Sequence, residues 1–149
     1  MLPLRDNIPS SRPPVVTYFI IAACLLVFLW QVQEKDLRTE FALNPAHLIH
    51  RDAGEPLSFV FLTILTSMFM HGGVLHLAGN MLFLWIFGDN VEDRMGHLRY
   101  LVFYLLCGTI AALAHALVSG FASVPVLGAS GAIAGVLGAY FVLFRGATV

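Results

Sequence analysis

Residues 100–144 read YLVFYLLCGTIAALAHALVSGFASVPVLGASGAIAGVLGAYFVLF and contain no Asp, Glu, Lys or Arg. A transmembrane helix needs about 20 consecutive, mostly apolar residues. This stretch is 45 residues long, and turn-forming residues at 119–125 interrupt it near its middle. It therefore predicts two membrane helices, at about 98–118 and 130–144.

Two more stretches without these charged residues occur earlier, and they are 21 and 33 residues long. A loop of mixed charge, residues 33–55, separates them, and its apolar residues suggest that it lies in the membrane interface. The elements expected in this half of the chain are a membrane helix at about 15–32, a semi-apolar segment at 57–70 and a membrane helix at about 74–88.

The composition points to the same class of protein. The chain is 58% hydrophobic and 11% charged, whereas soluble domains are about 45–50% apolar and about 25% charged. A formal charge of −1 gives no basic surface for nucleic acid. The fold predicted is all-α, a polytopic membrane helical bundle, whose first partner is the lipid bilayer.

The distribution of Lys and Arg predicts the orientation of the bundle. With the N-terminus in the cytoplasm, five such residues lie inside and three lie outside: Arg5, Arg12, Arg94, Arg99 and Arg145 against Lys35, Arg38 and Arg51. We therefore expect a cytoplasmic segment at 1–14 and a transmembrane domain at 15–149, in a bacterial cell (inner) membrane. The helices at 74–88 and 130–144 then both begin at the outer side.

Those two outer ends carry unusual polar residues. His76 and Asn80 are four residues apart and share one helix face, His71 lies just before them, and Ser130 begins the last helix. Polar side chains within a membrane span usually face a bundle interior or a water-filled cavity. His76 and Asn80 could therefore form hydrogen bonds between helices, and Ser130 could be the N-cap of the last helix.

The same residues could also perform acyl transfer. A serine nucleophile needs a base, and the tetrahedral intermediate needs hydrogen-bond donors at its oxyanion. An imidazole N–H, an amide NH₂ and a backbone N–H can supply such donors. Glycines at 131, 135 and 138 follow Ser130 on one helix stripe, which predicts close packing against neighbouring helices.

Three motifs, in order along the chain, carry a family resemblance: His71-x4-His76-x3-Asn80, Gly88-x3-Glu92-x-Arg94-x-Gly96 and Gly128-Ala129-Ser130-Gly131. Together they resemble the rhomboid intramembrane serine proteases, over about residues 17–144. The resemblance implies a six-helix bundle with a cavity that opens to the outer side. It also implies substrates that are transmembrane helices of other proteins, cleaved near their outer ends, and no cofactor or metal ion.

The resemblance also implies a role for each matching residue. Ser130 is the nucleophile, and His76, Asn80 and the Ser130 backbone stabilise the oxyanion. His71 supports the edge of the site. The structural residues are Glu92, Arg94, Gly128 and Gly131.

One feature departs from the family pattern. Rhomboids use a base histidine on a sixth helix, in an Ala-His-x-x-Gly pattern that is absent from these 149 residues. We therefore expect a truncated rhomboid with four of the six usual helices and doubtful activity of its own. His115 is a less favoured substitute base. The alternative function is a non-catalytic, rhomboid-like module that recognises transmembrane helices; the oligomeric state is not predicted.

Overall fold

The computed structural model describes residues 11–34, 36–50 and 56–146. Most of the expected cytoplasmic segment and part of the expected interface loop, with Arg5, Lys35 and Arg51, lie outside the described residues. Within the described ranges the secondary structure is helical. In chain order the elements are α1 (Val15–Gln33), α2 (Leu37–Phe41), the short 3₁₀ helix η1 (Pro45–Leu48), α3 (Leu57–Ser67), α4 (Val74–Met95), α5 (His97–Val118) and α6 (Ser130–Leu143).

Three of these helices are long and apolar enough to cross a membrane. They are α1, with 19 residues, and α4 and α5, with 22 residues each. The fourth expected membrane helix is present as α6, but it has 14 residues and is shorter than a typical span. The all-α membrane bundle predicted from the sequence is therefore confirmed, and α6 is shorter than the other three expected spans.

The largest difference from the expected elements is at the end of α4. The sequence predicts an end near Gly88, where the charged residues begin, but the helix continues to Met95. Asn90 and Glu92 in this added part are buried against the other helices. The charges at 89–94 therefore do not mark the end of the helix.

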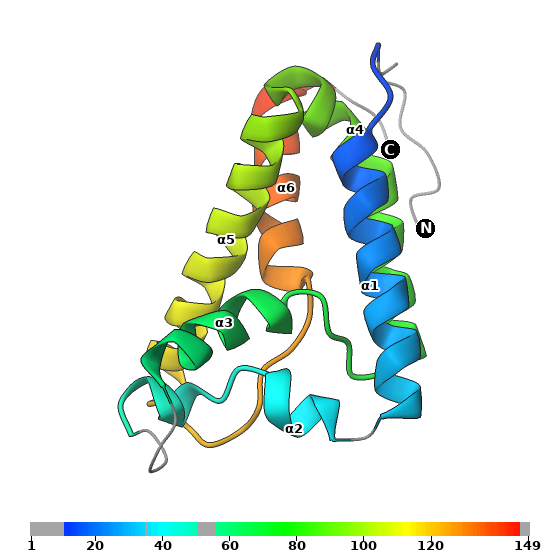
Figure 1. Ribbon diagram of the computed structural model, residues 1–149. Helices are drawn as coiled ribbons and strands as arrows, with labels where there is room; N and C mark the ends of the chain where they lie inside the picture. Colours follow the sequence, from blue (N-terminus) through cyan, green and yellow to red (C-terminus); the bar gives the residue numbers. More distant parts are fainter. Residues whose placement is uncertain (1–10, 35, 51–55, 147–149) are drawn as a thin grey trace.

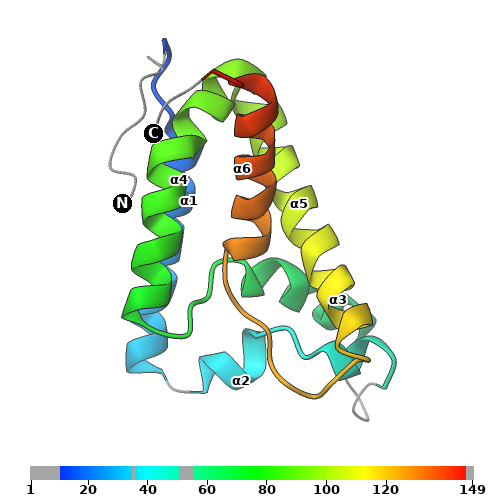
Figure 2. The ribbon, with the colours of Figure 1, turned by 180° about the vertical axis from the view of Figure 1, so that it is seen from behind.

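The four longer helices alternate in direction. In Figure 1, α1 and α5 run downward, whereas α4 and α6 run upward. Helix α6 packs against both α4 and α5, and α1 packs along α4. Figure 2 shows from behind that α4 and α6 begin at the same end of the bundle, beside α2 and α3. This end is called the site end below.

Small residues let α6 approach α5 closely. A Cβ on Gly131 would collide with Ala111, and a Cβ on Gly135 would collide with the Cys107 side chain. Gly138, the third glycine of the expected stripe, has nothing within 4 Å of the place where its Cβ would lie. The predicted close packing is thus confirmed for Gly131 and Gly135 and wrong for Gly138.

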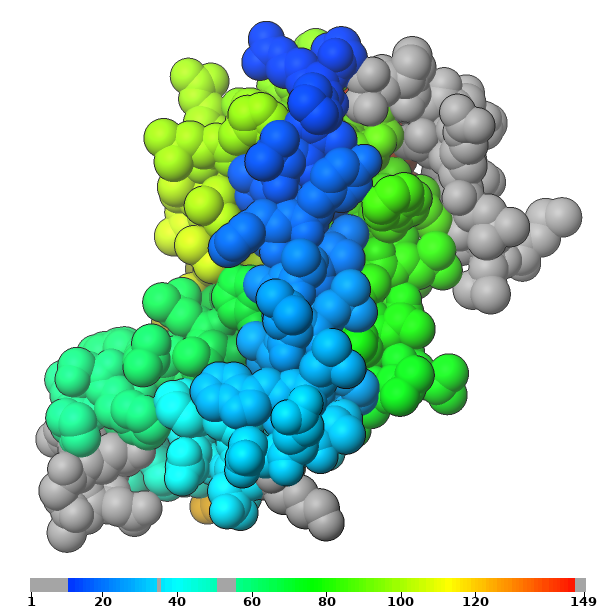
Figure 3. Space-filling view, turned by 45° about the vertical axis from the view of Figure 1, so that its right-hand side comes forward, coloured from blue at the N-terminus to red at the C-terminus, as the bar shows by residue number. Residues whose placement is uncertain are grey.

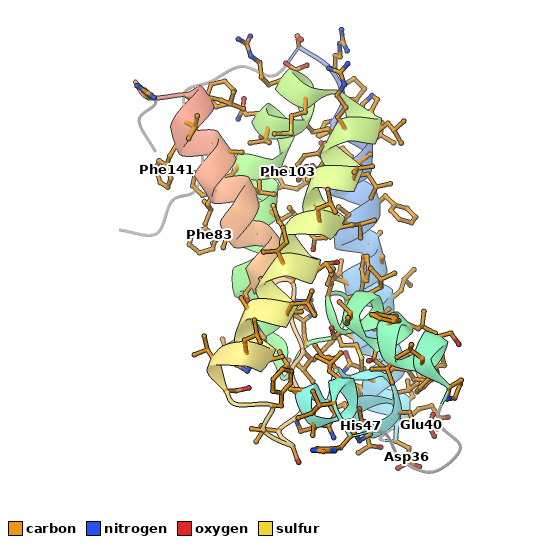
Figure 4. The ribbon with its side chains drawn as sticks, turned by 90° about the vertical axis from the view of Figure 1, so that its left-hand side faces the viewer. Asp36, Glu40, His47, Phe83, Phe103 and Phe141 are labelled. Atoms are coloured by element: carbon orange, nitrogen blue, oxygen red, sulfur yellow. The ribbon has the colours of Figure 1, made fainter. Side chains whose placement is uncertain are left out.

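The outer faces of the helices are apolar. Exposed side chains of α1 include Phe19, Leu26, Leu29 and Trp30, and α1 crosses the middle of the face drawn in Figure 3. Figure 4 places Phe83, Phe103 and Phe141 along the long helices, and Asp36, Glu40 and His47 at the site end. An apolar helical part with charged groups at its ends suits a lipid bilayer.

Candidate active site

The structure brings the polar residues predicted from the sequence to one end of the bundle. His76 and Asn80 lie in the first two turns of α4, and His71 lies just before that helix. Ser130 is the first residue of α6, after the N-cap residue Ala129. Because both helices begin at the site end, His76 and Ser130, which are 54 positions apart in the chain, both lie close to Gly128.

Gly128 lies close to both the imidazole of His76 and the hydroxyl of Ser130. A Cβ on Gly128 would lie 2.9 Å from His76 Nε2 and 3.8 Å from Ser130 Oγ. The backbone φ of Gly128 is 129°, a conformation that residues with a side chain rarely adopt. Its N–H donates to the carbonyl of Ser67 over 2.8 Å, which ties the loop to the end of α3. Glycine is thus required here for both backbone conformation and space.

Asn80 presents a free donor. The residue is 8% exposed, and its Nδ2 atom is buried without a hydrogen-bond partner among the described residues. Leaving a buried amide unpaired is costly, so such a group often marks a place where a ligand or water binds. Asn80 and His76 lie on the same face of α4, as their spacing predicts.

His71 is buried beside His76 rather than open to water. The two rings meet edge to face, with centroids 5.3 Å apart, and Nδ1 of His71 lies 3.3 Å from the carbonyl oxygen of Phe69. Burial, together with the neighbouring imidazole of His76, lowers the pKa of His71 to about 4. His71 is therefore neutral at physiological pH.

A cavity of about 190 Å³ adjoins Ser130. Its walls come from the end of α3, from α5 and from the loop before α6, and they include Ser67, Gly108, His115 and Gly128. Ser130 and His115 thus line one cavity, although they belong to different helices. Among the described residues, no three His, Cys, Asp or Glu side chains gather as a metal site.

Glu92 and Arg94, the charged residues of the middle motif, lie at the far end of the bundle. Glu92 is 1% exposed and accepts the backbone N–H groups of Val16 and Thr17, each over 2.8 Å. It also accepts from Thr17 Oγ1 over 2.7 Å and lies 2.6 Å from His97 Nδ1. Arg94 is exposed. Glu92 therefore joins α4 to the starts of α1 and α5.

In α1, two buried polar residues were not predicted from the sequence. Gln31 and Thr17 are buried in α1, where Gln31 contacts the loop of His71 and Thr17 contacts Glu92. The sequence feature that could have identified them is their polarity within residues 13–33, a 21-residue stretch that is otherwise largely apolar. Their partners lie 40 and 75 residues further along the chain.

The bundle and its exposed apolar faces define an integral, multi-pass membrane protein. The family model for the rhomboid domain matches residues 58–148, which is more than half of the chain. The chain belongs to the rhomboid family.

Curated relatives include bacterial and mitochondrial proteins. Rhomboid protease GluP of Bacillus subtilis is 37% identical over 87% of this chain and 24% of its own length. Rhomboid protein 1, mitochondrial, of Saccharomyces cerevisiae is 36% identical over 94% of this chain and 40% of its own length. The human presenilin-associated rhomboid-like protein, mitochondrial, is 34% identical over 80% of this chain and 30% of its own length. The chain thus spans less than half the length of each of these relatives.

Proposed function

We propose that Ser130 is the nucleophile of an intramembrane serine endopeptidase site, which cleaves transmembrane helices of other proteins near the site end of the bundle. The observation that carries this proposal is that Ser130 Oγ and His76 Nε2 both lie within 4 Å of the point where a Cβ on Gly128 would be. The free amide of Asn80 on the same face of α4 adds a second donor. The name of GluP, a rhomboid protease, supports the same activity.

The reaction follows from these groups. Ser130 Oγ attacks the carbonyl carbon of the scissile peptide, whose oxygen becomes an oxyanion. His76 Nε2–H, the Asn80 amide and the Ser130 backbone N–H donate to that oxyanion. The backbone N–H belongs to the first turn of α6, where N–H groups lack helical partners and the helix dipole favours negative charge. These donors contribute most when the oxyanion forms.

The hydroxyl proton of Ser130 has to pass to a base, which later protonates the leaving amine. The family resemblance assigns this role to a histidine in an Ala-His-x-x-Gly pattern, and residues 1–149 contain no such pattern. Removing the histidine of a soluble serine protease lowers kcat by roughly 10⁶-fold. Residues 1–149 alone are therefore expected to cleave at background rates.

The charges support an N-terminus on the cytoplasmic side. Arg12, Arg94, Arg99 and Arg145 flank the end of the bundle where α1 begins, and Arg38 lies at the site end. By the rule that Lys and Arg favour the inner side, the site opens to the outer side. Since relatives occur in a bacterium and in mitochondria, the bacterial cell membrane is one setting in which this orientation can be tested.

The test joins residues 1–149 to the fifth and sixth helices of a rhomboid relative. This protein is expected to cleave a model transmembrane substrate, and a fluorophosphonate probe is expected to label Ser130. Ser130→Ala abolishes both, whereas Ser123→Ala, at an exposed serine of the preceding loop, leaves both unchanged. Cleavage that persists in Ser130→Ala would rule out the serine-protease mechanism.

The second candidate is a non-catalytic module that binds transmembrane helices. It is favoured because no base within the described part of the chain makes a hydrogen bond to the Ser130 side chain. It predicts that a transmembrane peptide binds to the joined protein while the probe does not label Ser130. Strong labelling of residues 1–149 that disappears in His115→Ala would instead make His115 the base, since it lines the same cavity.

A further inference from the structure

Gln31 is a buried polar side chain near the end of a membrane helix, 2% exposed. Its Oε1 accepts the backbone N–H of His71 over 3.0 Å, and its Nε2 donates to the backbone carbonyl of His71 over 3.4 Å. A polar group within a membrane span is costly unless it is paired. Here the carbonyl oxygen and the NH₂ group of the Gln31 amide both bond to the backbone of His71, the first residue of the candidate site.

The peptide unit that Gln31 holds also reaches His76. The carbonyl of His71 and the N–H of Gly72 belong to one planar peptide group and point in opposite directions. Gln31 binds the carbonyl, and the Gly72 N–H donates to His76 Nδ1 over 3.4 Å. The Gln31 amide therefore sets the direction of the N–H that faces the imidazole.

A donor at Nδ1 decides where the imidazole carries its own proton. A neutral histidine has one N–H and one acceptor nitrogen, and a hydrogen bond at one nitrogen fixes the role of the other. With Nδ1 accepting from Gly72, the proton lies on Nε2. Nε2 and its neighbour Cε1 are the ring atoms that face Gly128, and Ser130 Oγ lies 3.8 Å from the same place where a Gly128 Cβ would be.

We propose that Gln31 is a positioning residue, which acts through the 71–72 peptide to keep His76 in the tautomer that donates from Nε2. The value of this tautomer for an oxyanion rests on the proposed function, but the tautomer itself does not. In the opposite tautomer, Nε2 would be an acceptor facing a developing negative charge, and the site would lose one of its donors.

The test uses residues 1–149 in detergent micelles, with ¹⁵N-labelled histidine and glycine. The His76 signals are assigned by their loss in His76→Gln. We expect Nδ1 of His76 to be unprotonated and Nε2 to be protonated at neutral pH, with slow exchange of the Gly72 amide. Gln31→Met is expected to increase the Nδ1–H tautomer and to speed exchange at Gly72 roughly tenfold, the scale of one hydrogen bond.

Two further variants complete the design. Gln33→Met removes the same side chain at an exposed position two residues away and is expected to change neither signal. Gln31→Glu keeps the acceptor for the His71 N–H but, when ionised, has no donor for its carbonyl, so it should shift the tautomer in the same direction as Gln31→Met.

A protonated Nδ1 in the parent chain would overturn the proposal even if Gln31→Met failed to fold. So would an unchanged tautomer in a folded Gln31→Glu. Neither readout depends on cleavage. Cleavage that persists in Ser130→Ala would rule out the serine-protease mechanism but would leave the proposal about the tautomer unaffected.

Discussion

The carboxylate of Glu92, near the end of α4, caps the start of α1 by accepting the backbone N–H of Thr17 over 2.8 Å. The first N–H groups of a helix have no partner within that helix. In α1 the N-cap residue is Pro14, which makes no side-chain cap. A residue 75 positions away supplies the missing acceptor, so this capping interaction is also a contact between helices.

Glu92→Ala is expected to lower the free energy of unfolding by about 3 kcal/mol or more, because it leaves buried N–H groups of α1 unpaired. Glu92→Gln, which keeps the volume but puts an NH₂ group toward those donors, is expected to cost about 2 kcal/mol. Thermal unfolding in detergent measures both, with the exposed Glu34→Gln as the matched control. Equal melting of Glu92→Gln and the parent would contradict the assigned cap.

Gly135→Ala is expected to destabilise the bundle by about 1–3 kcal/mol, because the added methyl collides with Cys107 of α5. Gly138→Ala, one turn further along α6, meets open space and should be neutral or stabilising by up to about 1 kcal/mol. The same unfolding measurement compares them. Adding Cys107→Gly should restore part of the loss in Gly135→Ala; no restoration would show that the collision is not its cause.

The sequence predicts the helices well because charge-free stretches and chain length decide where a membrane span can lie. The start of α4 at Val74 and the end of α5 at Val118 were both expected. The end of α4 was missed, because charge alone cannot show that Glu92 finds its partners in α1 and at the start of α5. Gln31 was missed for the same reason, since its role depends on a backbone contact 40 residues away.

In residues 1–149 joined to the fifth and sixth helices of a relative, we expect His76→Ala and Asn80→Ala each to lower kcat roughly 10²–10³-fold. This is the cost of losing one oxyanion donor. KM should change little, because these donors act mainly on the transition state. Steady-state cleavage of the model substrate gives both constants. Leu75→Ala, at a neighbouring exposed position, serves as the control, and a pure rise in KM for His76→Ala would assign it to substrate binding instead.

The stability of the bundle should fall as the pH is lowered from about 6.5 to about 4. Burial lowers the pKa of His71 to about 4, while the unfolded chain takes up its proton near 6.5. The unfolded state therefore binds more protons in this range, and His71 contributes a slope of at most about 1.4 kcal/mol per pH unit. Unfolding of His71→Gln measured across this range should show a flatter profile than that of the parent, and an equally steep profile would contradict the assignment to His71.

The orientation can be tested with single cysteines in a Cys24→Ala, Cys107→Ala background. His50→Cys lies at the site end and Gly146→Cys follows α6 at the opposite end, and both positions are exposed. Neither change alters the count of Lys and Arg. An impermeant maleimide added to intact cells is expected to label position 50 and to leave position 146 unlabelled until the membrane is opened. The reverse pattern would invert the orientation.

The cap on α1 also bears on the order in which the protein is made. Glu92 lies 76 residues after Val16 and 75 after Thr17, so the first N–H groups of α1 cannot receive this carboxylate until α4 has been made. One side chain of a later helix therefore makes the start of the first helix dependent on the packing of α1 against α4.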